Sequence, residues 1–145
     1  MKLDTIQNKV FADFNSIEKK LNQWKFFGEK IVFSYGCYDM MNARHLAYLS
    51  KASEMGTKLI IGLNSDHQEQ LLNSEKPLNA QFERALVLAS LMLVDAVVLY
   101  DDKTPLNLIL QIKPDVLVKG SNYRLDQIVG AQEVIAFGGE VNIID

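Results

Sequence analysis

The segment from Ser34 to His45 combines a glycine with basic side chains at the start of an expected helix. Gly36 follows a short apolar run, and a glycine there lets the backbone turn sharply and approach a ligand closely. The first amides of a helix lack partners within the helix, and with the helix dipole they form a site for anions. Arg44 and His45 would add side-chain donors. The pattern predicts a binding site for a phosphate group.

The same segment also has a purely structural interpretation. Asn42 is a favoured N-cap residue and Asp39 is a common turn residue. Cys37 is the single cysteine of the chain. We expect it to be a small turn residue and not a nucleophile, because no base other than His45 is near it in the sequence to activate the thiol. A capped turn without a ligand is therefore the alternative.

The elements that must position this segment alternate between strand and helix. The expected strands are apolar runs without polar alternation, which is typical of strands covered on both faces. Helices between them imply right-handed crossovers and a parallel sheet, with ligands at the carboxyl ends of its strands. Strands are expected at 30–34, 59–63, 96–99, 115–118 and 140–144, and helices at 42–55, 79–92, from 105 onward, and 130–137. We predict an α/β, Rossmann-like domain over residues 29–145, with a parallel five-stranded sheet and helices on both faces.

Residues 1–28 are expected to form an N-terminal helical extension that packs on this domain. Apolar residues from Ile6 to Trp24 recur close to helical spacing, and Gly28 is a plausible stop. Asn15 and Glu18 have the spacing of a capping box, so a second helix is expected to start at Asn15.

Composition excludes several classes of partner. The chain has 145 residues and a net charge of −3, so it fits one domain and has no basic excess for nucleic acid. No apolar run approaches the roughly 20 residues of a membrane span, and the N-terminus lacks the apolar core of a signal peptide. One cysteine offers neither an internal disulfide nor a zinc framework. We predict a cytoplasmic protein without membrane contact and without a metal bound by its own side chains.

Several short segments resemble, in order, the small cytidylyltransferase-like enzymes, and most closely the heptose-1-phosphate adenylyltransferases of lipopolysaccharide precursor synthesis. The resemblance covers residues 29–144. Ordered matches of this kind are more specific than one short motif. The segments are Tyr35-Gly36-Cys37-Tyr38-Asp39, Asn64-Ser65-Asp66, Lys76-Pro77-Leu78-Asn79 with Arg84, Thr104-Pro105, 113–120, Ile128-Val129-Gly130-Ala131 and Gly138-Gly139-Glu140-Val141.

This resemblance implies transfer of a nucleotidyl group from ATP or CTP to a sugar (heptose-like) or polyol phosphate, with release of pyrophosphate. The expected partners are a nucleoside triphosphate carrying Mg²⁺ and the sugar or polyol phosphate; a homodimer is an assembly that the resemblance leaves open. The implied catalytic residues are Asn42, Arg44 and His45. The implied nucleotide or phosphate contacts are Gly36, Cys37, Tyr38, Arg84, Lys119 and Gly120. The implied substrate contacts are Asp39, Asp66, Asn122 and Tyr123.

The sequence departs from the family pattern at several of these positions. The family's His-x-Gly-His motif reads Asn42-Ala43-Arg44-His45, and Leu72-Asn73 stands where an arginine or lysine pair is usual. Lys-Gly-Gly-Asp-Tyr becomes residues 119–123, Lys-Gly-Ser-Asn-Tyr, and the sequence ends at Asp145, before a Ser-Thr-Thr segment that helps to hold the triphosphate. Each lost charge-assisted contact costs about 2–4 kcal/mol of transition-state stabilisation. The alternative function is therefore a degenerate member that binds a nucleotide, a sugar phosphate or a protein partner without turnover.

Overall fold

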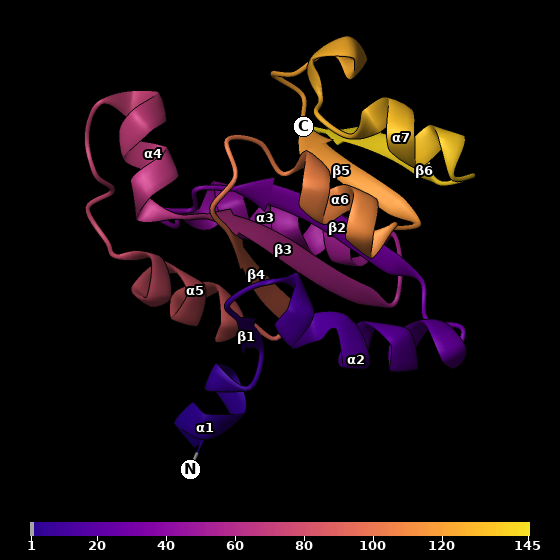
Figure 1. The fold of residues 1–145 in the computed structure, drawn as a ribbon, viewed down its shortest axis with the longest axis horizontal. Helices are drawn as coiled ribbons and strands as arrows, with labels where there is room; N and C mark the ends of the chain where they lie inside the picture. The colour runs from indigo at the N-terminus through magenta and orange to yellow at the C-terminus, as the bar shows by residue number, and fades with distance from the viewer. Residues whose placement is uncertain (1) are drawn as a thin grey trace.

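The computed structural model describes residues 2–145. Over these residues, six parallel strands form one sheet in the order β1-β4-β3-β2-β5-β6 (Figure 1). The strands are β1 Val10–Phe11, β2 Ile31–Gly36, β3 Lys58–Asn64, β4 Ala96–Tyr100, β5 Val116–Gly120 and β6 Glu140–Ile144. The helices are α1 Lys2–Gln7, α2 Phe14–Phe26, α3 Ala43–Ser53, α4 Asp66–Asn73, α5 Gln81–Ala89, α6 Leu106–Ile112 and α7 Ala131–Ala136, with a 3₁₀ turn, η1, at Leu125–Gln127.

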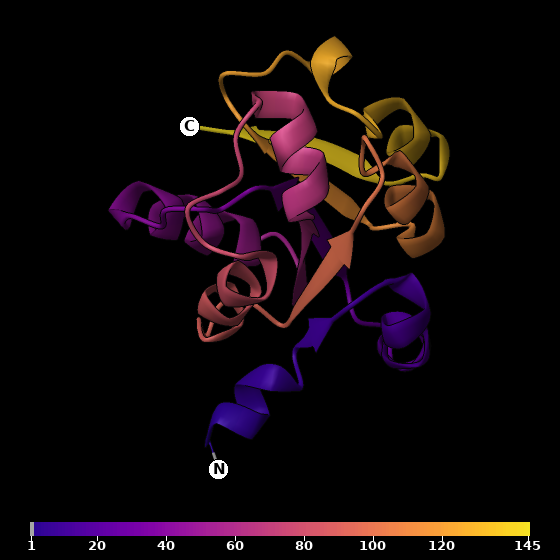
Figure 2. The ribbon, with the colours of Figure 1, turned by 60° about the vertical axis from the view of Figure 1, so that its left-hand side comes forward.

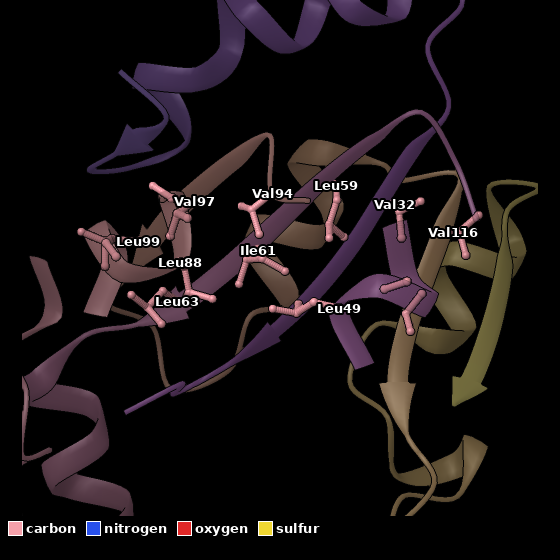
Figure 3. Close-up of a cluster of buried hydrophobic side chains, with 14 of the residues drawn as sticks. Val32, Leu49, Leu59, Ile61, Leu63, Leu88, Val94, Val97, Leu99 and Val116 are labelled. Carbon is pink, nitrogen blue, oxygen red and sulfur yellow. The ribbon is translucent and has the colours of Figure 1, made fainter. Parts of the chain in front are cut away.

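Two layers of helices cover the sheet. Helices α3 and α5 lie on one face, and α2, α6 and α7 lie on the other (Figure 2). Neighbouring strand residues point to opposite faces, so Val32 and Ile61 belong to the first core while Phe33 and Ile60 belong to the second. Figure 3 shows the first core, in which Leu49 of α3 and Leu88 of α5 meet the strand side chains. Both faces are buried, which is why the strand sequences show no polar alternation.

The expectation of five strands was wrong, because a short edge strand lies within the segment expected to be helical. Val10 and Phe11 of β1 pair in parallel with Val97 and Val98 of β4. The Lys9 Nζ donates to the Val94 carbonyl at 2.9 Å. This bond links the edge strand to the loop between α5 and β4. Two residues are too few to produce a period-2 pattern.

The start expected for the second N-terminal helix was also wrong. Helix α2 begins at Phe14, and its N-cap is Asp13, whose side chain accepts from the Ser16 amide. Ile17 and Leu21 of α2 are buried in the second core. Residues 2–28 thus contribute a strand and part of the core to the same sheet that residues 29–145 build.

The remaining strands and helices agree with the predicted order, with small shifts at their ends, except that helix α4 and the 3₁₀ turn η1 were not predicted. Asn79 was expected to cap a helix, but the N-cap of α5 is Ala80 and makes no side-chain bond. The chain runs from β2 outward through β3 and β4, and then crosses to β5 and β6 on the other side of β2. The switch point therefore lies between the carboxyl ends of β2 and β5, at Gly36 and Gly120, where such sheets bind ligands.

Candidate functional site

A hollow of about 250 Å³ lies at this switch point. We call it the switch-point hollow. It brings together residues from the end of β2, the start of α3 and the end of β5 with the loop after it. Its lining residues are Tyr35, Gly36, Cys37, Tyr38, His45, Tyr48, Lys119, Gly120, Asn122 and Tyr123.

Lys119 is the buried cation of this hollow. The residue is 9% exposed, and its Nζ donates to the Tyr35 carbonyl oxygen at 3.0 Å. The Nζ also lies 4.1 Å from the ring centroid of Tyr35 and 4.8 Å from that of Tyr123. Burial lowers the pKa of Lys119 to about 8. Within residues 2–145 no carboxylate forms an ion pair with it, so the site holds a desolvated positive charge that an anion would stabilise.

The start of α3 is closed by a reciprocal capping box. The Asn42 Oδ1 accepts from the amides of Arg44 at 3.0 Å and His45 at 3.2 Å. In return, the Asn42 amide donates to the His45 Nδ1 at 3.2 Å. The imidazole packs against the Tyr38 ring, with 5.9 Å between centroids. The expected capped turn is therefore present, and His45 belongs both to this cap and to the lining of the hollow.

Arg44 is exposed and lies beside the hollow, not within it. It lines a neighbouring recess of about 680 Å³ together with Ser121, Ile144 and Asp145. The recess shares His45, Tyr48, Gly120 and Asn122 with the switch-point hollow. The recess thus holds the basic side chain of Arg44 and the acidic side chain of Asp145 near the end of β6.

Arg84 faces the protein interior, which gives no support to the predicted phosphate contact. It is 1% exposed. Its Nε donates to the Asn79 carbonyl at 3.1 Å, its Nη1 to the Cys37 carbonyl at 2.8 Å and its Nη2 to the Asn64 carbonyl at 3.0 Å. The Nη2 also pairs with the Asp66 Oδ1 at 2.8 Å. Arg84 therefore joins three loops behind the hollow.

The two acidic residues expected at the substrate are similarly engaged. Asp66 accepts from Arg84 and, through Oδ2, from the Gln81 amide at 3.0 Å. The Asp39 carboxylate accepts from the amides of Leu78 at 2.7 Å and Asn79 at 2.9 Å. Asp39 thereby holds the loop before α3 against the loop before α5, and neither residue lines the switch-point hollow.

Cys37 lines the hollow as a protonated thiol, whereas the Asn73 side chain is bonded to a neighbouring residue of its own helix. Burial first, and then the charge of Glu69, raise the pKa of the Cys37 thiol to about 11, so the thiol stays protonated and is a poor nucleophile. Asn73, the neutral replacement in the family pattern, donates to the Glu69 carboxylate at 2.9 Å.

Tyr35 and Tyr48 belong to the site but were not predicted. Tyr48 lies three residues after His45, and its hydroxyl contacts the Ser34 Oγ at 2.7 Å and donates to the Val118 carbonyl at 3.0 Å. That contact ties α3 to the ends of β2 and β5. Helical spacing from His45 was the signal that could have identified Tyr48.

A larger hollow of about 750 Å³ lies at the opposite edge of the sheet, where the strands begin. Three of its charged side chains already have partners: Lys25 donates to the Ile112 carbonyl, and Lys30 pairs with Glu140 at 3.3 Å. It also lies away from the switch point, so we do not assign the site to it.

The side chains do not fit a resident metal ion. Within residues 2–145, no cluster of three or more histidine, cysteine or acidic residues is arranged to hold one. Asp39 and Asp66, the two carboxylates expected at the substrate, accept the hydrogen bonds described above. In the same part of the chain, none of the helices has the length and apolar character that crossing a membrane requires.

Known proteins resemble this chain in sequence and in fold. The bifunctional protein HldE of Wolinella succinogenes is 49% identical over 121 residues, which is 83% of this chain and 26% of that protein. The HldE of Methylobacillus flagellatus is 43% identical over 135 residues, covering 92% of this chain and 28% of that protein. The chain thus spans about a quarter of the length of these relatives.

Two solved structures share the fold. The lipopolysaccharide core biosynthesis protein from Thermoplasma volcanium has a TM-score of 0.68 at 21% identity, over 81% of this chain and 95% of that one. Pantoate-beta-alanine ligase from Francisella tularensis has a TM-score of 0.65 at 12% identity, over 92% of this chain and 65% of that one.

Residues 33–141 match the family described as Cytidylyltransferase-like. With most of the sheet, the switch-point hollow and Lys119 inside the matched range, this chain belongs to the cytidylyltransferase-like family of nucleotidyltransferases.

Proposed function

We propose that the chain transfers a nucleotidyl group from ATP or CTP to a sugar phosphate or polyol phosphate and releases pyrophosphate. The observation that carries this proposal is the buried Lys119 ammonium, which shares the switch-point hollow with His45 and has no ion-pair partner among the described residues. An uncompensated cation is costly inside a protein, and a bound phosphate removes that cost.

The relatives favour one version of the reaction. The HldE proteins and the resemblance to heptose-1-phosphate adenylyltransferases both favour ATP as the donor and a heptose 1-phosphate as the acceptor. Assembly as a homodimer and a cytoplasmic location stay predictions from the resemblance and from composition.

In the proposed reaction, an oxygen of the acceptor phosphate attacks the α-phosphorus. The bond from that phosphorus to the bridging oxygen of the β-phosphate breaks, and pyrophosphate leaves with the electron pair. No protein nucleophile is needed, in agreement with the protonated thiol of Cys37. Mg²⁺ would enter as part of the nucleotide substrate, as the resemblance implies.

The side chains supply alignment and charge. Lys119 and His45 would donate to phosphoryl oxygens, and Arg44 would add positive charge from the adjoining recess. Asn122 and Tyr123, at the edge of the hollow, would contact the substrates. Asp39, Asp66 and Arg84 would act by holding the loops in place, since their polar atoms bind other parts of the chain.

A second candidate function is binding without turnover. It is favoured by the Asn42 side chain, which accepts hydrogen bonds from two backbone amides at the start of α3. Without these bonds, the two amides could donate to a phosphate. Such a protein would bind nucleotide or sugar phosphate through Lys119 and His45 but would not accelerate the transfer.

The deciding experiment is pyrophosphate release from ATP, CTP, GTP and UTP, each combined with heptose 1-phosphates, glycerol 3-phosphate and pentitol 5-phosphates. Lys119→Gln serves as the matched control. We expect release with one nucleotide and one acceptor, and loss of release in the control. Nucleotide binding by calorimetry with no release from any pair would favour the second function. Absence of both binding and release would contradict both functions.

A further inference from the structure

The capping box at the start of α3 determines which nitrogen of His45 is available to a ligand. The Asn42 amide is a donor, so the Nδ1 that lies 3.2 Å away must offer its lone pair. In a neutral imidazole the proton is then on Nε2. Nε2 has no bond to any other described residue, while His45 itself lines both the switch-point hollow and the neighbouring recess.

The capping box also removes backbone donors from the site. The Asn42 Oδ1 is bonded to the amides of Arg44 and His45, so these two groups do not face an incoming anion. The Tyr38 ring packs against the side of Gly36 that lacks a side chain, because a Cβ built on Gly36 would lie 3.1 Å from that ring. A ligand therefore cannot approach the Gly36 backbone from that side. Tyr38 holds this position with a φ of 50°, a left-handed conformation that is uncommon for a non-glycine residue.

We propose that residue 42 positions His45 in two ways: its backbone amide keeps the His45 proton on Nε2, and the Asn42 side chain occupies the amides of Arg44 and His45. A phosphoryl oxygen is then bound by the His45 Nε2–H and the Lys119 ammonium instead of by these two amides. The inference rests on the proposed function for the ligand class, which is a phosphate ester or pyrophosphate. It assigns to Asn42 an indirect role in place of a direct contact with the ligand.

Nitrogen NMR of the imidazoles tests the tautomer directly. In the neutral imidazole we expect the Nε2 of His45 to resonate as a protonated nitrogen and its Nδ1 as an unprotonated one. His67, the other histidine, is exposed and is removed by His67→Gln for assignment. A protonated Nδ1 in neutral His45 would overturn the proposal.

Two substitutions of His45 separate capping from ligand binding. Glutamine is the usual partner at this position of a capping box, so His45→Gln keeps the bond to the Asn42 amide but replaces the imidazole. We expect a melting temperature close to that of the wild type and a loss of about tenfold in affinity for inorganic pyrophosphate. His45→Ala should lose both properties. Unchanged affinity in His45→Gln would contradict the proposal.

Asn42→Ala distinguishes the indirect role from a direct one. This variant keeps the backbone donor to His45 but frees the amides of Arg44 and His45. We expect a melting temperature lowered by about 3 °C, from loss of the cap, and pyrophosphate affinity that is equal to or higher than in the wild type. A loss of about tenfold would show that the Asn42 side chain contacts the anion and would overturn the inference.

The failure of this inference can be told apart from failure of the proposed function. If the wild type releases pyrophosphate but His45→Gln retains full affinity, the reaction stands and the inference fails. If the wild type neither binds nor releases pyrophosphate, the proposed function fails together with the assigned ligand. The NMR result then reports on the Asn42 to His45 bond alone.

Discussion

The Lys119 Nζ lies 3.0 Å from the Tyr35 carbonyl oxygen and 4.1 Å from the centroid of the Tyr35 ring. Each residue is the last but one of its strand, Lys119 in β5 and Tyr35 in β2, and these neighbouring strands flank the switch point. Tyr35 thus holds the ammonium in place through a carbonyl dipole and an aromatic face, neither of which neutralises its charge. The carbonyl bond and the ring contact orient the cation, and under the proposed function a bound anion would neutralise its charge.

Replacing Lys119 should separate stability from binding. In Lys119→Gln the buried charge is removed while an amide can still donate to the Tyr35 carbonyl. We expect ATP affinity to fall by about tenfold or more, because a charge-assisted hydrogen bond is lost. The melting temperature should stay equal or rise, since no ion pair is broken. Calorimetry and thermal unfolding measure the two effects, and a lower melting temperature with full affinity would assign Lys119 to the core alone.

Nucleotide affinity should depend on the ionisation of Lys119. Its pKa is about 8 in the free protein, and only the protonated form attracts the triphosphate. Affinity for ATP should therefore be constant below this pH and should fall as the pH rises through it, by at most about tenfold per unit. Titrations in buffers of different ionisation enthalpy should show proton uptake on binding. The Lys119→Gln variant should show neither effect.

The same ionisation has the opposite consequence for the stability of the free protein. The folded-state pKa of Lys119, about 8, lies below the ordinary value of 10.5. Between these values the unfolded chain binds more protons than the folded one, so this group makes the free energy of unfolding rise with pH. Denaturant titrations at several pH values should show a smaller rise in Lys119→Gln than in the wild type. An identical pH dependence in both proteins would contradict the assigned pKa.

Removal of the Arg84 guanidinium should destabilise the fold. In Arg84→Met the carbonyls of Cys37, Asn64 and Asn79 and the Asp66 carboxylate lose their donor. Breaking one side of a buried ionic network costs about 3–5 kcal/mol. Arg44→Met is the matched control, because that arginine is exposed, and its unfolding free energy should change by less than about 0.5 kcal/mol. Similar unfolding free energies for the two variants would contradict the structural role of Arg84.

The N-terminal segment should be required for stability. Ile17 of α2 is fully buried in the second core, so Ile17→Ala should lower the unfolding free energy by about 2–5 kcal/mol. Glu18→Ala, at the exposed neighbouring position, should have little effect. Urea titrations compare the variants. If both behaved like the wild type, residues 2–28 would be a dispensable extension, as the division of the sequence at residue 28 supposed.

Local patterns in the sequence determined most of the elements and the place of the site. The apolar runs of β2 to β6 and the glycine after Tyr35 are short-range features, and the switch point follows from the alternation of strands and helices. The Asn42 cap was also readable, because a capping bond joins residues only three apart. The family's residue order points to His45 and Lys119, and both residues line the switch-point hollow.

Only the tertiary structure decided what the charged side chains do. Arg84 meets the Cys37 carbonyl across 47 positions, and Lys119 meets Tyr35 across 84. Sequence cannot distinguish an arginine that is hydrogen-bonded inside the protein from one that faces a ligand. The outcome depends on which carbonyls and carboxylates the fold brings within hydrogen-bond distance of the guanidinium. The edge strand β1 likewise depends on the free edge of β4, which exists only once the sheet has formed. The depressed pKa of Lys119 has the same origin, since desolvation is a property of the packed site and not of the residue.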